Sequence, residues 1–102
     1  MNDLDTGFLA TVATQMMNDT QVTVAGKSWL VTRTSSSRLK TVRFQMNGRD
    51  CQAIEQNPEK PSRWGKLARE GHQVVQFRDV ATGKYVAVAV DGEVKVYGRE
   101  RG

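Results

Sequence analysis

The clearest pattern of apolar and polar positions lies in the last third of the chain, where three short apolar segments follow one another. Residues 74–77, 85–90 and 94–97 are rich in valine and aromatic side chains, and the turn pairs Thr82-Gly83 and Asp91-Gly92 separate them. Such runs, bounded by turns, are typical of antiparallel strands. The middle segment is apolar on both faces, which predicts a central strand that is covered on both sides.

The two turns also predict which residues face each other across these strands. We expect Phe77 to lie opposite Val88, and Ala87 to lie opposite Val96. The alanines of the middle strand are small, so they leave space for a bulky neighbour, either a helix or Trp64.

The strongest turn signal in the chain is Asn47-Gly48, the preferred centre of a type I′ hairpin turn. A two-residue turn there pairs Phe44 with Cys51 and Val42 with Ala53, so these apolar side chains share one face. The opposite face is polar and holds Thr41, Arg43, Gln45, Asp50 and Gln52. This hairpin predicts an antiparallel sheet with one face in solvent.

Two shorter strands are predicted before this hairpin, over 22–24 and 29–32, around a turn at 25–27. A helix is predicted from Asp5 to Asn18, because apolar residues recur there at helical spacing: Phe8, Leu9, Val12 and Met16. The apolar side of this helix either lies across one face of the sheet or meets another subunit.

A second helix is predicted over 61–70, with Ser62 as its N-cap and Gly71 as the left-handed residue that ends it. We expect Trp64, on the apolar side of this helix, to be a core residue that pins the helix to the sheet rather than a ligand-stacking residue. Gly65 lowers helix stability by about 1 kcal/mol relative to alanine, which predicts a close contact that only a small residue allows.

Together these elements predict an α+β fold. We expect an N-terminal helix, a twisted antiparallel sheet of about seven short strands in hairpins and a C-terminal meander, and a second helix at about 61–70 between the fourth and fifth strands. The sheet either stays open or curls into an open barrel. A chain of 102 residues is expected to form one domain over residues 1–102, with residues 1–4 and 98–102 frayed.

Composition narrows the class of protein. The chain is 38% hydrophobic and 25% charged, as soluble globular domains are, and no apolar run approaches the ~20 residues that span a membrane. Its acidic start lacks the basic and apolar segments of a signal peptide. Because Cys51 is the only cysteine, no intrachain disulfide can form. We therefore expect a cytoplasmic protein without a membrane partner.

The residue types that catalysis needs are scarce. His72 is the only histidine, and the hairpin register places the only cysteine, Cys51, on an apolar face, where a thiol is a small buried hydrophobe rather than a nucleophile. Metal-ligand spacings and a glycine-rich phosphate loop are absent from the sequence. We therefore expect no catalytic residues, no metal site and no cofactor, and the chain is not predicted to be an enzyme.

The net charge of +4 is unevenly distributed. Residues 1–32 hold one basic residue against three acidic ones, whereas residues 33–102 hold fourteen against eight. A basic excess favours a polyanionic partner, so the leading hypothesis is a non-catalytic binding module with a basic surface that contacts nucleic-acid phosphates. The candidate residues are Arg33, Arg38, Lys40, Arg43, Arg63, Lys66 and Arg69. Among the aromatic residues, only Tyr85 and Tyr97 lack a predicted core position, which makes them the stacking candidates.

The alternative hypothesis is a protein–protein interaction module or a homo-oligomeric structural module, such as a homodimer. It would use exposed sheet edges and the apolar side of the N-terminal helix. A third hypothesis is small-ligand binding in a half-closed barrel, with Trp29 or Trp64 lining the cavity.

Overall fold

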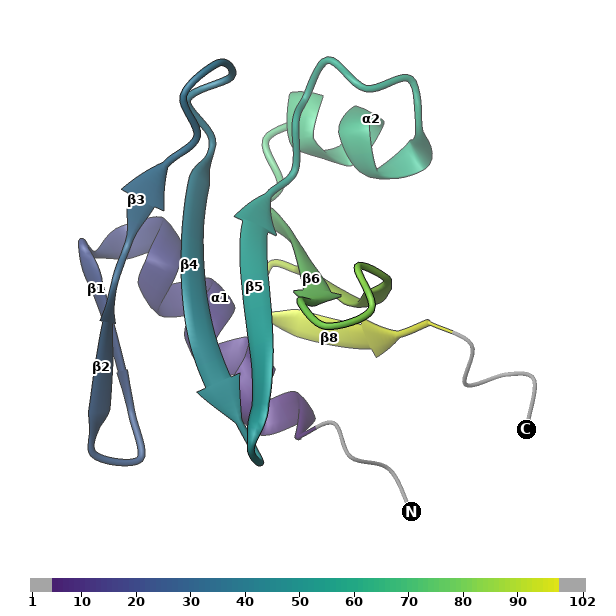
Figure 1. Cartoon of the computed structure of the whole chain (residues 1–102). Helices are drawn as coiled ribbons and strands as arrows, with labels where there is room; N and C mark the ends of the chain where they lie inside the picture. Colours follow the sequence, from purple (N-terminus) through teal and green to yellow (C-terminus); the bar gives the residue numbers. More distant parts are fainter. Residues whose placement is uncertain (1–4, 98–102) are drawn as a thin grey trace.

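The computed structural model describes residues 5–97 and confirms the α+β class (Figure 1). Residues 1–4 and 98–102, which the sequence predicts to be frayed, lie outside the described residues. The elements within 5–97 are α1 (Thr6–Asn18), β1 (Gln21–Val24), β2 (Lys27–Leu30), β3 (Thr32–Arg33), β4 (Lys40–Met46), β5 (Arg49–Glu55), α2 (Arg63–Arg69), β6 (Val74–Asp79), β7 (Tyr85–Val90) and β8 (Glu93–Val96). The segment predicted as one strand over 29–32 is divided between β2 and β3, so α2 follows the fifth strand rather than the fourth.

Six of these strands form one antiparallel sheet in which each strand pairs with the next one along the chain, in the order β3-β4-β5-β6-β7-β8. Strands β1 and β2 form a separate two-stranded ribbon. The large sheet stays open, with β3 and β8 at its edges. It twists so strongly that β8 runs nearly across the direction of β5 (Figure 1).

The hairpin of β4 and β5 has the predicted register. Phe44 lies opposite Cys51, and Val42 lies opposite Ala53. The φ angles of Asn47 (53°) and Gly48 (75°) are both positive, as a type I′ turn requires. The predicted pairing of Ala87 with Val96 between β7 and β8 is likewise confirmed.

The predicted register between β6 and β7 is wrong by one residue. Phe77 lies opposite Ala87 rather than Val88, and the pairing shifts between Phe77 and Arg78, so that Arg78 lies opposite Tyr85. A bulge of this kind turns the following side chains to the other face of a sheet. Tyr85 therefore shares a face with Arg78.

The loop after β6 explains this shift. One carboxylate oxygen of Asp79 accepts hydrogen bonds from the backbone N–H groups of Ala81 (2.9 Å) and Thr82 (3.3 Å). Aspartate side chains commonly stabilise turns in this way. The loop therefore closes as a longer turn than the two-residue Thr82-Gly83 turn that the sequence suggests.

Helix α1 covers one face of the sheet. Asp5 caps its start by accepting a hydrogen bond from the N–H of Phe8 (3.0 Å). The apolar side of the helix, including Leu9, Val12 and Met16, is buried against β1 and the sheet. The predicted placement across one sheet face is therefore confirmed, and the apolar side of α1 is covered within the chain itself.

The prediction that Trp64 is a core residue is wrong. Trp64 is half-buried and lies outside the hydrophobic core, which is built on the α1 side of the sheet. Hydrogen bonds and a close backbone contact hold α2 instead. Arg69 donates through Nη1 to the carbonyls of Pro58 (2.6 Å) and Lys60 (2.9 Å). A Cβ added at Gly65 would lie 2.1 Å from the Lys60 carbonyl oxygen, which confirms the need for a small residue there.

Candidate functional site

The face of the sheet opposite α1, called here the open face, carries the polar side chains of the strands. Cross-strand pairing defines its membership. One row of neighbours crosses β4 to β7 and consists of Arg43, Gln52, Arg78 and Tyr85. The next row crosses β4 to β8 and consists of Thr41, Ile54, Gln76, Val88 and Lys95.

Hydrogen bonds between side chains link the strands across the open face. Gln52 accepts a hydrogen bond from Arg78 through Oε1 and donates through Nε2 to Thr41 Oγ1 (3.0 Å). Gln76 accepts from the hydroxyl of Tyr97 through Oε1 (2.7 Å) and donates through Nε2 to Gln56 Oε1 (2.9 Å). Because these groups are held by one another, the face presents polar atoms in a fixed arrangement.

A concave hollow of about 610 Å³, the aromatic groove, lies between the open face and the α2 region. Its lining includes Gln56, Lys60, Trp64, Gln76, Tyr85 and Tyr97. A second hollow of about 260 Å³ shares Gln56, Lys60, Gln76 and Tyr85 with it and extends toward Leu39 and Ile54. In Figure 1, α2 stands at one end of the sheet, whereas α1 lies behind β4 and β5.

Three aromatic side chains from distant parts of the chain meet in the aromatic groove. Tyr85 is 51% exposed, Tyr97 is 37% exposed and Trp64 is half-buried. Partial burial raises the pKa of the Tyr97 hydroxyl, so this group stays protonated near neutral pH. The Arg63 guanidinium lies 4.6 Å from the centroid of the Trp64 ring, within cation–π range. The groove therefore combines aromatic surface with a positive charge at its rim.

The structure separates the seven basic residues that the sequence singles out. Arg43 lies on the open face, and Arg63 lies beside the aromatic groove. Lys66 is exposed on α2, and Arg38 is exposed in the loop after β3.

The other three basic residues, Lys40, Arg33 and Arg69, donate hydrogen bonds to backbone carbonyls away from the open face. Lys40 belongs to the α1 side of β4, and its Nζ donates to the carbonyl of Met17 (2.9 Å). Arg33, its neighbour on β3, donates to the carbonyl of Arg38 (2.7 Å). Both guanidinium bonds of Arg69 go to the loop before α2. The seven residues do not form a single basic surface.

Two basic residues on this side of the molecule were missed by sequence reasoning. Arg78 stands in the middle of the open face, and Lys60 lines the aromatic groove. The strand alternation around Arg78, between the buried residues Phe77 and Asp79, is the signal that could have placed it on the open face. Lys60 lies in a loop, where no periodic pattern exists.

The open face carries an acidic side chain, Asp50 near the β4–β5 turn, among several basic side chains. Within residues 5–97, none of Arg43, Lys60, Arg63 and Arg78 forms a salt bridge. Among residues 5–97, the Nε atom of Arg78 is buried without a hydrogen-bond partner, and the one acceptor of this side chain is the neutral amide oxygen of Gln52. Arg78 therefore places a positive charge at the centre of the face.

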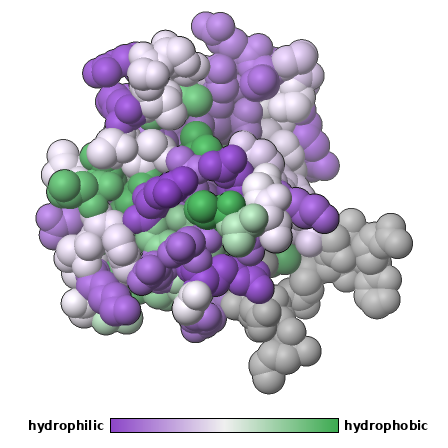
Figure 2. Space-filling model, in the orientation of Figure 1, coloured by the Kyte–Doolittle hydropathy of each residue, from purple (hydrophilic) through white to green (hydrophobic). Residues whose placement is uncertain are grey.

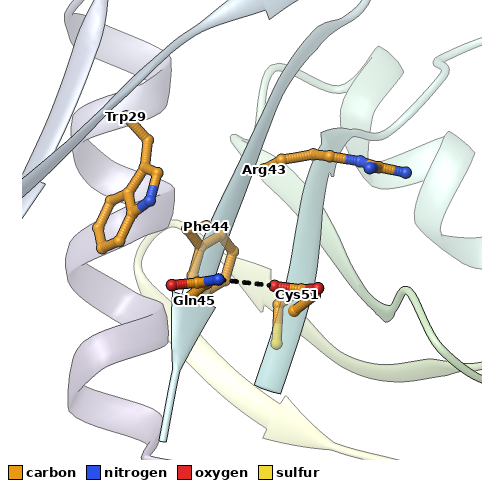
Figure 3. A pocket seen from close by; sticks show the side chains of 6 residues that line it. Trp29, Arg43, Phe44, Gln45 and Cys51 are labelled. Carbon is orange, nitrogen blue, oxygen red and sulfur yellow. Dashed lines mark hydrogen bonds between the residues drawn. The ribbon is translucent and has the colours of Figure 1, made fainter. Parts of the chain in front are cut away.

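A further hollow of about 350 Å³ opens between β2 and β4, and residues from both faces line it (Figure 3). Trp29 lies near α1, while the side chain of Arg43 extends across β5 (Figure 3). Between them, Gln45 Nε2 donates to Asp50 Oδ1 (3.0 Å), which is the dashed line in the figure. The hollow marks the place where the ribbon of β1 and β2 diverges from the large sheet.

The residues most often used in catalysis lie apart from one another. Cys51 is buried beneath α1, and burial raises the pKa of its thiol. His72 Nδ1 lies 2.7 Å from Asp91 Oδ2 at an exposed position between the end of α2 and the β7–β8 turn. No group of three or more histidine, cysteine or acidic residues is placed to hold a metal ion in the described part of the chain.

Comparisons with protein-family models, curated proteins and solved structures find no match to this chain. Neither helix within 5–97 is long and apolar enough to cross a membrane. The open face and the aromatic groove are therefore the features from which a function can be inferred.

Proposed function

We propose that the protein binds nucleic acid through the open face of its six-stranded sheet. The observation that carries this proposal is the convergence of Trp64, Tyr85 and Tyr97 with Lys60 in one hollow. Arg63 lies against the Trp64 ring and Arg78 lies opposite Tyr85 on the neighbouring strand. Phosphate binding requires positive charge and hydrogen-bond donors, which Arg43, Lys60, Arg63 and Arg78 supply.

The aromatic side chains favour nucleic acid over other polyanions. An acidic peptide or a sulfated sugar would use the cations but would leave the aromatic rings without a role. Nucleobases offer flat aromatic faces, and stacking on protein rings is a common contribution to their binding. Figure 2, drawn from the same side as Figure 1, shows small hydrophobic patches among hydrophilic side chains over the middle of the sheet.

The test is fluorescence anisotropy of labelled single-stranded DNA, duplex DNA and RNA, titrated with the protein at several salt concentrations. We expect the logarithm of the association constant to fall linearly with the logarithm of salt concentration. The double variant Arg43→Gln/Arg63→Gln should reduce the slope by roughly 0.7–0.9 for each phosphate that the variant no longer neutralises.

The matched control is Lys27→Gln/Arg33→Gln, which removes the same charge away from the open face. Lys27 lies in the β1–β2 ribbon, and Arg33 is paired with Lys40 on the α1 side. The control should keep the wild-type slope. Absence of binding to every nucleic acid at low salt would refute the proposal.

A protein–protein interaction is the second candidate, favoured by one observation. Leu30 on β2 is 71% exposed, beside the place where the β1–β2 ribbon leaves the sheet. The apolar side of α1 is not available for such a contact, because it is buried within the chain. Light scattering over a concentration series, with Leu30→Asp as the variant, would detect a self-association that depends on this position.

A further inference from the structure

We propose that the nucleic acid bound by the open face is single-stranded and that one unpaired base lies in the aromatic groove against Trp64, Tyr85 and Tyr97. This inference rests on the proposed function, because it concerns the same surface. It adds the state of the nucleic acid and the position of one base.

The geometry of a duplex argues against double-stranded nucleic acid at this site. In a duplex each base face is covered by its neighbours in the stack, so a protein reads only base edges and the backbone. The rings of Tyr85 and Tyr97 lie in a concave site beside α2 and do not protrude as a helix or ribbon that could enter a groove of DNA. These rings can contact a base face only when the base has left the stack.

The dimensions of the aromatic groove suit a small flat ligand. Its volume of about 610 Å³ falls within the ~300–1,000 Å³ range of small-ligand sites. One side is formed by sheet residues such as Gln76 and the other by Trp64. A base entering between them would meet the Trp64 ring on one side and the rings and amides of Tyr85, Tyr97 and Gln76 on the other.

The amides of Gln56 and Gln76 can meet the polar edge of a base. The orientation of the Gln76 amide is set by the Tyr97 hydroxyl on its oxygen and by Gln56 on its nitrogen. A glutamine amide has two donor hydrogens and two acceptor lone pairs, so each group of Gln76 keeps one further hydrogen-bonding position. An oriented amide of this kind suits nucleobases, which present donors and acceptors side by side.

The cations define a path for the phosphate backbone. Arg63 and Lys60 stand at the groove, and Arg78 and Arg43 follow on successive parts of the open face toward β4. The row from Tyr85 to Arg43 crosses three strand intervals, which is roughly 14 Å at about 4.8 Å per interval. A strand running from the groove toward β4 would therefore keep its phosphates beside positive charge.

The first experiment compares a 12-nucleotide single strand with a hairpin duplex that contains the same sequence, as DNA and as RNA. We expect the single strands to bind at least tenfold more tightly than the duplexes. Tyr85→Ala should weaken single-strand binding about 5- to 150-fold, the range expected for the loss of one stacked base. The salt slope should not change, because no charge is removed.

Leu30→Ala is the matched control, since it also truncates an exposed apolar side chain but lies on β2. It should leave single-strand affinity unchanged. Tyr97→Phe keeps the ring and removes the hydroxyl that orients Gln76, so it should weaken binding less than Tyr97→Ala does. Circular dichroism of each variant checks that the fold is retained.

The second experiment uses tryptophan fluorescence. In the Trp29→Phe variant, Trp64 is the only tryptophan, and stacking of a base in the groove should quench its emission as unlabelled single strand is added. Two results would overturn this inference while leaving the proposed function intact. One is equal affinity for duplex and single strand. The other is single-strand binding that neither quenches Trp64 nor weakens in Tyr85→Ala. Failure to bind any nucleic acid would instead overturn the proposed function itself.

Discussion

The two faces of the six-stranded sheet are built by alternate residues of the same strands, yet their side chains have different surroundings. On the α1 side, Phe44 and Phe77 are 2% and 0% exposed and their ring centroids lie 6.4 Å apart. On the open face, Tyr85 and Tyr97 remain partly exposed, and glutamine and arginine side chains link the strands. Because α1 and the β1–β2 ribbon cover one face with apolar side chains, the polar side chains of the other face need little packing and are free to contact a binding partner.

The largest expected effect contrasts a core phenylalanine with an open-face tyrosine. Phe44→Ala should lower the free energy of unfolding by about 3–5 kcal/mol, since it leaves a cavity beneath α1. Tyr85→Ala should change it by no more than about 0.5 kcal/mol, because the ring is half in solvent. Urea denaturation of both variants measures the difference. A large loss in Tyr85→Ala would mean that the open face is a packed surface.

An intermediate effect is expected where α2 is attached. In an isolated helix, Gly65→Ala would be stabilising. In this protein the new Cβ would clash with the Lys60 carbonyl oxygen, so the variant's free energy of unfolding should fall by about 1–3 kcal/mol through overpacking. Gly7→Ala in α1 is the matched control, since its Cβ would lie 3.4 Å from the Asp5 carboxylate, an ordinary contact. Gly7→Ala should be neutral or stabilising by up to about 1 kcal/mol. Denaturation curves of the two variants should therefore shift in opposite directions or by clearly different amounts.

The smallest expected effect is a pH dependence at the exposed contact between His72 and Asp91. Hydrogen bonds from His72 and from the N–H of Gln73 lower the pKa of Asp91 in the folded chain. Stability from the ionised carboxylate is therefore present above the unfolded pKa of about 3.9 and is lost as pH falls through the lower folded value. Thermal unfolding of the wild type and Asp91→Asn from pH 2 to 6 should show a gap that is constant above about pH 5 and shrinks below about pH 4. A gap that widens toward low pH would contradict this assignment.

Local patterns were sufficient for much of the fold. The Asn47-Gly48 turn sets the register of β4 and β5 within a few residues, and the alternation along those strands predicted which face is polar. The helical spacing from Phe8 to Met16 predicted the cover over the other face. Each of these features depends on backbone geometry and on neighbours close in sequence.

The errors lie where a specific polar or backbone contact overrides a hydrophobic pattern. Trp64 has the spacing of a core residue, but the hydrogen bonds of Arg69 and the close approach of Lys60 to Gly65 pack α2 against the loop before it. The register of β6 and β7 depended on the Asp79 side chain, which lengthens the turn. Neither contact follows from hydrophobic periodicity.

The candidate site likewise combines features that local sequence predicted with features that it did not. The sequence alone determined that Arg43 lies on a polar sheet face and that Tyr85 and Tyr97 lack obvious core positions. Only the tertiary structure decided that these tyrosines meet Trp64 and Lys60 in one hollow beside Arg78, and that the Lys40 ammonium binds the Met17 carbonyl. The physical reason is that strand alternation and turn preferences act over a few residues. The groove instead depends on the bulge between β6 and β7, the twist of the six-stranded sheet and the position of α2 together.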